Sequence, residues 1–112
     1  MDSRIAAWLL LGISVVSEVA GTVALRQSDG FARLTPAVIA GSCYVLAVWL
    51  MSISMKQLEM GLTYAIWAGS GTALTALVGI IVFGESANFP KLVGLAFVVA
   101  GLALMGLGSG RA

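Results

Sequence analysis

Clusters of charged residues divide the chain into four long apolar segments. Of its six basic and five acidic residues, only Glu18 lies inside a segment, and the others lie at segment ends. A helix rises about 1.5 Å per residue, so about 20 apolar residues cross the hydrocarbon core of a bilayer. We therefore predict an all-α integral membrane protein, a single domain over residues 1–112 with transmembrane helices at about 5–25, 34–55, 60–84 and 88–107.

The composition limits the functions that the chain can have. Hydrophobic residues make up 60% of the sequence and charged residues 10%, which is too apolar for a water-soluble domain. The sequence contains no histidine, no glycine-rich phosphate loop and no basic patch. We therefore expect no enzymatic activity, no metal site, no cofactor and no nucleic-acid partner.

Glu18 is the main candidate functional residue. A carboxylate deep in a bilayer costs several kcal/mol unless it is protonated, paired or in contact with water, and it usually handles a proton or a cation. Ser14, Glu18 and Thr22 follow at intervals of four and share one helix face, and Gly21 leaves space beside Glu18. We predict that this face lines a cavity, in which Glu18 exchanges protons for a cation.

Three aromatic residues inside the spans suit an organic cation. Tyr64 and Trp67 are three residues apart on one face of the third segment, and aromatic ring faces attract cations. Tyr44 lies deep in the second segment, where its hydroxyl needs a partner such as Glu18. We predict that all three side chains line the substrate pocket.

Glycines indicate a possible hinge and a packing face. Gly69 and Gly71 lie in the third segment, where they are candidate hinge residues for alternating access. Gly94, Gly101 and Gly108 recur every seven residues in the fourth segment, on nearly one helix face. Because small residues let two helices approach closely in lipid, we predict that this face forms a dimer interface.

The loops carry balanced positive charge. Four spans place three basic residues on each side of the membrane, Arg4, Lys56 and Arg111 on one side and Arg26, Arg33 and Lys91 on the other. The positive-inside rule therefore gives no preferred orientation. We infer that the chain inserts both ways and forms an antiparallel homodimer with two copies of Glu18, equivalent to the inverted repeats of larger transporters.

With these features the chain resembles the small multidrug resistance transporters. The resemblance is carried by SEVAGT at residues 17–22, by SDGF at residues 28–31 with Arg33, Leu34 and Pro36 after it, and by YAIWAG at residues 64–69 with Gly71. Thr35 departs from the family pattern, which often has Trp at that position. It implies a proton-coupled antiporter, an antiparallel homodimer of four-helix subunits in a bacterial inner membrane. By the matching motif, Glu18 binds protons and substrate in alternation, while Tyr44, Tyr64 and Trp67 line the site.

The resemblance also bears on the substrate. The branch that exports guanidinium typically has Trp where this chain has Gly21, and Ser where it has Ala47. Gly21 together with Tyr44 resembles the branch that exports lipophilic or quaternary ammonium cations, which we therefore expect as substrates. The alternatives are a guanidinium exporter, one half of a heterodimeric exporter, and a helical membrane interaction protein that transports nothing.

Overall fold

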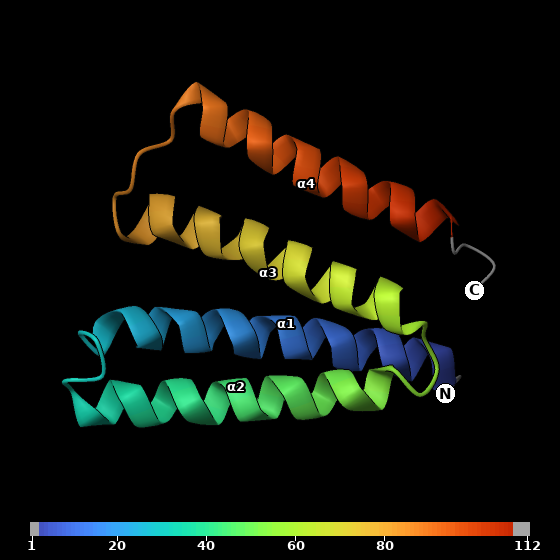
Figure 1. The fold of residues 1–112 in the computed structure, drawn as a ribbon, viewed down its shortest axis with the longest axis horizontal. Coiled ribbons are helices and arrows are strands. Elements are labelled where there is room, and N and C mark those ends of the chain that lie inside the picture. Colours follow the sequence, from blue (N-terminus) through green and yellow to red (C-terminus); the bar gives the residue numbers. More distant parts are fainter. Residues whose placement is uncertain (1–2, 109–112) are drawn as a thin grey trace.

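The computed structural model describes residues 3–108, which fold into four helices (Figure 1). The helices are α1 (Ser3–Gln27), α2 (Leu34–Ser54), α3 (Met60–Val82) and α4 (Phe89–Gly108). All four are long and apolar enough to cross a membrane. The predicted set of four transmembrane helices is confirmed, with ends within about two residues of those expected from the charge pattern.

The helices lie in the order α2, α1, α3, α4 across the subunit (Figure 1). α1 packs along α2 on one side and against α3 on the other, and α4 contacts α3 alone. None of the residues Phe89–Gly108 is buried. The subunit is therefore an open row in which α1 and α3 carry the internal contacts and α4 is covered only on the side that meets α3.

A tight turn ends α1 and leads into α2. Asp29, Gly30 and Phe31 all have positive φ, at 51°, 66° and 69°. This left-handed backbone is unfavourable for a residue such as phenylalanine. The hydroxyl of Ser28 stabilises the turn, because it donates to the carbonyl of Leu25 at 2.7 Å and accepts from the Phe31 amide at 3.1 Å.

Serine hydroxyls join α1 to α2. Three of them donate across the contact to backbone carbonyls, Ser14 to Ala47 at 2.6 Å, Ser17 to Cys43 at 2.8 Å and Ser54 to Ala7 at 2.8 Å. Such bonds between membrane helices contribute about 0.6 kcal/mol on average. Because each needs a particular side-chain direction, together they fix the rotation of α1 about its axis and so decide which residues face α3.

Candidate functional site

Glu18 lines a groove between α1 and α3. The groove has a volume of about 470 Å³, and its lining contains two carboxylates and no basic side chain. The lining residues are Glu18, Thr22, Trp67, Ala68, Gly71, Thr72, Thr75, Ala76 and Glu85. A groove of this lining attracts cations and disfavours anions.

Two hydroxyl groups connect Glu18 to α2. The Thr22 hydroxyl donates to Oε2 of Glu18 at 2.9 Å and lies 2.7 Å from the Tyr44 hydroxyl. Thr22 carries one hydroxyl hydrogen, so when that hydrogen goes to the carboxylate the Tyr44 hydroxyl must be the donor to Thr22. Tyr44 thus acts on Glu18 through Thr22, whereas the sequence suggested a direct contact.

Gly71 gives the Glu18 carboxylate its position against α3. Gly71 is buried, and a Cβ atom built on it would overlap Oε1 of Glu18. Gly69 lies on the side of α4, where an added Cβ would be 2.7 Å from Cδ2 of Leu102. Both glycines lie inside one continuous helix. The structure gives each glycine a packing role, and the hinge expected at these positions stays a prediction.

Ser14 and Gly21 face α2, whereas the sequence suggested that they line the cavity around Glu18. Ser14 has no exposed surface and faces α2, to whose backbone it is bonded. Gly21 is also buried, since a Cβ there would lie 3.0 Å from Cβ of Cys43 and 3.2 Å from the Tyr44 ring. The space that we expected beside Glu18 is therefore filled by α2, because the missing Gly21 side chain admits the Tyr44 ring.

The aromatic pair of α3 is divided between the groove and the outer surface. The rings of Tyr64 and Trp67 have centroids 5.8 Å apart and are tilted by 35°. Trp67 lines the groove, and its buried Nε1 has no hydrogen-bond partner within the described residues. Tyr64 is 55% exposed and does not line the groove. Of this pair, Trp67 is the ring that lines the groove with Glu18.

The sequence did not single out three polar residues of the groove. Thr75 lies one turn beyond Gly71 on the same face, so helical spacing alone could have found it, and Thr72 lies beside Gly71. Glu85 follows the end of α3 and returns to it through Gly84, whose φ is +67°. Nothing in the local sequence pattern indicates that return.

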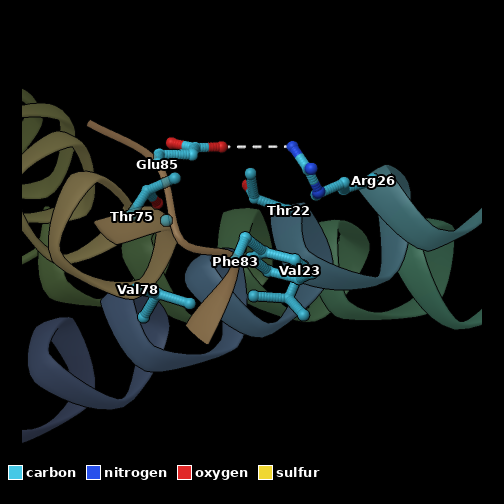
Figure 2. A pocket seen from close by; sticks show the side chains of 8 residues that line it. Thr22, Val23, Arg26, Thr75, Val78, Phe83 and Glu85 are labelled. Carbon is cyan, nitrogen blue, oxygen red and sulfur yellow. Dashed lines mark hydrogen bonds and ion pairs between the residues drawn. The ribbon is translucent and has the colours of Figure 1, made fainter. Parts of the chain in front are cut away.

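An ion pair lies at the loop end of the groove (Figure 2). Nη1 of Arg26 is 3.1 Å from Oε2 of Glu85, and the guanidinium carbon is 4.5 Å from the centroid of the Phe83 ring. These side chains line a smaller cavity of about 170 Å³, which shares Thr22, Thr75 and Glu85 with the groove. The two cavities therefore adjoin each other between Glu18 and the end of α1.

The fold and the groove define a class of protein. The described residues contain no group of three or more side chains that could hold a metal ion. Four helices of membrane-spanning length place a carboxylate with hydroxyl and indole neighbours within their apolar span. An ionisable group in that position marks the path of an ion or a charged substrate. The chain is thus a multi-pass membrane protein with an intramembrane site suited to cations.

Comparison with known proteins identifies the family. Residues 6–98 match the family described as Small Multidrug Resistance protein, and the chain belongs to it. Similar proteins include one of Proteus vulgaris named guanidinium exporter, 43% identical over 86% of this chain and 92% of its own length. The quaternary ammonium compound-resistance protein QacF of Klebsiella aerogenes is 37% identical over 89% of this chain and 91% of its own length. The multidrug resistance protein EbrA of Bacillus licheniformis is 39% identical over 92% of this chain and 98% of its own length.

Membership of this family shows where the protein is located and that it is a transporter. The chain is a transporter of the bacterial inner membrane and not an enzyme. The alternative of a helical interaction protein that transports nothing is therefore wrong. The names of the relatives divide between guanidinium and larger cations, so they leave the substrate of this chain open.

We predict that Gly71→Ala weakens cation binding. The added methyl group would displace the Glu18 carboxylate from Gly71 and from the Thr22 hydroxyl. Overpacking of this kind costs about 1–3 kcal/mol, and about 1.4 kcal/mol corresponds to a tenfold change in affinity. A titration of the detergent-purified protein with tetraphenylphosphonium should show roughly a tenfold loss.

Gly61→Ala is the matched control for this substitution. It adds the same methyl group to α3 at a position where a Cβ atom meets nothing within 4 Å. We expect its affinity to equal that of the unmodified protein. Equal affinities for the Gly71 and Gly61 variants would show that the carboxylate does not depend on the space at Gly71.

Proposed function

We propose that this protein exports hydrophobic and quaternary ammonium cations in exchange for protons, and that Glu18 binds the two in alternation. The observation that carries the proposal is the position of the Glu18 carboxylate. It lies within a membrane-spanning helix, lines a groove, and is held by Thr22 on one side and Gly71 on the other.

Competition at one carboxylate is sufficient for coupling. An ionised Glu18 attracts a cation into the groove, and a proton on the same carboxylate removes that attraction. The protein can then switch the side to which the groove opens when Glu18 carries either a proton or a cation. The switch is disfavoured when the carboxylate is bare, because an uncompensated charge in hydrocarbon is costly. A proton gradient therefore drives cations the other way, as long as the site opens to the two sides in turn.

The size and lining of the groove support a large cation. A volume of about 470 Å³ lies in the range of roughly 300–1,000 Å³ that is typical of sites for drug-sized molecules. The Trp67 ring supplies a face for cation–π attraction. Gly21 and Tyr44 form one packing unit, since the ring occupies the space of a side chain at position 21. The two features that resemble the quaternary ammonium branch, Gly21 and Tyr44, are thus a single structural feature.

Guanidinium is the second candidate substrate. It is favoured by the relative of Proteus vulgaris named guanidinium exporter, which is 43% identical to this chain. The hydroxyl groups of Thr22, Thr72 and Thr75 in the groove also offer acceptors for the hydrogen-bond donors of a guanidinium ion. A quaternary ammonium ion has no such donors and would leave these hydroxyls unused.

A homodimer would complete the site. None of the α4 residues is buried, and Cβ atoms built on Gly94, Gly101 and Gly108 meet nothing within 4 Å. A flat glycine face of this kind suits close packing against a second α4. We propose an antiparallel pair, in which the balanced loop charges permit both orientations. Tyr64, exposed in the single subunit, would then be available to the partner.

We predict that Glu18→Gln abolishes proton-driven cation transport. The change keeps the size of the side chain and removes both its charge and its exchangeable proton. Proteoliposomes with an imposed pH gradient should take up tetraphenylphosphonium only at the background rate. In the unmodified protein, the apparent Kd should rise as the pH falls, by up to about tenfold per pH unit for each proton displaced.

Glu59→Gln is the control for the loss of a carboxylate. Glu59 is exposed at the start of α3, and its side chain makes no capping hydrogen bond. Its replacement should leave transport unchanged. Undiminished uptake by the Glu18→Gln variant would overturn the proposed mechanism.

Proton release distinguishes the two candidate substrates. Each cation that binds an initially protonated Glu18 displaces a proton, which a pH indicator detects in weakly buffered detergent solution. We expect release at lower concentrations of tetraphenylphosphonium than of guanidinium, because the larger cation also contacts Trp67. The opposite order would assign the protein to guanidinium export.

We predict that Gly101→Leu weakens the dimer. The leucine side chain would keep two α4 helices apart. A rise of about 5- to 150-fold in the dimer dissociation constant is expected from the cost of overpacking, which is about 1–3 kcal/mol. Crosslinking in detergent at falling protein concentration measures the change. Ala103→Leu is the control, because it places the same side chain on a different face of α4. Equal dimer stability in the two variants would exclude the glycine face as the interface.

A further inference from the structure

Glu85 is a second carboxylate with a defined position that the mechanism above does not use. Its backbone amide donates to the carbonyl of Gly79 at 3.0 Å, which folds the chain back over the end of α3. A Cβ atom built on Gly79 would overlap Oε1 of Glu85. Glu85 therefore lies against a glycine of α3 in the same way that Glu18 lies against Gly71.

The two carboxylates belong to one groove. Glu18 and Glu85 both line the groove, and Thr22 and Thr75 line it together with the smaller cavity beyond. Gly71 and Gly79 are eight residues apart in α3, which corresponds to about 12 Å along the helix. A cation that leaves Glu18 toward the end of α1 therefore meets hydroxyl groups and then a second negative charge.

A guanidinium group already occupies the position beside Glu85. The Arg26 side chain extends over Phe83 toward the Glu85 carboxylate (Figure 2). Its Nη1 is 3.1 Å from Oε2 of Glu85, and its guanidinium carbon is 4.5 Å from the Phe83 ring centroid. A carboxylate beside an aromatic face is a common arrangement for binding organic cations. The protein's own arginine shows that a cation of this chemistry fits.

The Arg26 side chain is easy to displace. The side chains of Arg26 and Glu85 are 56% and 42% exposed. Exposed ion pairs contribute little net stability, because water screens the charges and two long side chains lose freedom. A cation from the groove can therefore displace Arg26 from Glu85 at little energetic cost. Because Arg26 remains tethered nearby, it also competes with the bound cation for Glu85 and promotes its release.

We propose that Glu85 and Phe83 form an outer cation subsite at the loop end of the groove, which Arg26 occupies when no substrate is bound there. Its ligands are guanidinium or ammonium groups of the transported cation, on the path between Glu18 and water. The inference rests on the proposed function, since it assigns this subsite to the same transport path. Arg26 acts as a tethered competitor and prevents a cation from staying at Glu85.

The subsite is tested by binding in a background in which the inner site is disabled. Glu18→Gln protein in detergent is titrated with guanidinium chloride, and the backbone amide resonances of Gly79, Phe83 and Glu85 are followed by NMR. We expect saturable shifts, at several-fold lower concentration when Arg26→Gln is added. Phe83→Leu should weaken the binding and Glu85→Gln should abolish it, while Glu59→Gln leaves it unchanged.

Two results would overturn the subsite. One is the absence of saturable shifts in the Glu18→Gln, Arg26→Gln protein. The other is binding that persists after Glu85→Gln or that is unchanged by Phe83→Leu. The Phe83 variant keeps the test decisive if the Glu85 variant does not fold. Either result leaves the role of Glu18 intact, because that role is judged by transport in proteoliposomes and not by this titration.

Discussion

The structure depends on how a carboxylate is accommodated inside the membrane. Glu18 lies within the span of α1, where an isolated charge costs several kcal/mol. The protein supplies one hydroxyl donor from Thr22, a second hydroxyl behind it from Tyr44, and an α3 backbone that comes close because Gly71 has no side chain. These contacts are enough to position the carboxylate and leave part of its surroundings open as a groove. An unfilled groove beside a held carboxylate is what a transported cation requires.

The polar side chains of α1 divide between two neighbours. Ser14 and Ser17 donate to carbonyls of α2 and hold that helix in place. Glu18 and Thr22 lie at the other edge of the same polar stripe and line the groove toward α3. A hydroxyl that donates its hydrogen to a backbone carbonyl has none left to donate to a ligand, and Ser14 has no exposed surface. The α2 contact therefore fixes the helix rotation, and the α3 side remains free for chemistry.

The sequence predicts the four helices well, because charged residues mark the ends of each span, and it singles out Glu18 as the one charge within a span. The sequence predicts less well which neighbouring helix each side chain faces. Ser14 and Glu18 are one turn apart and share a face, but a shared face about 100° wide can meet two different helices. Gly21 likewise has space beside it in any single-helix view, and only the position of Tyr44 shows that the space is filled. The roles of Gly71 and Glu85 arise from contacts between α3 and distant residues, which periodicity within one segment does not contain.

The exposure of α4 has a different meaning in lipid than it would have in water. A fully uncovered apolar helix on a soluble protein would demand a partner, but lipid covers such a surface at no cost. The argument for self-association therefore rests on shape. Gly94, Gly101 and Gly108 leave a smooth face on which two backbones can approach, and the gain comes from van der Waals contact that lipid tails do not match. The same reasoning explains why α3 approaches α4 at Gly69, where Leu102 fills the space of a missing side chain.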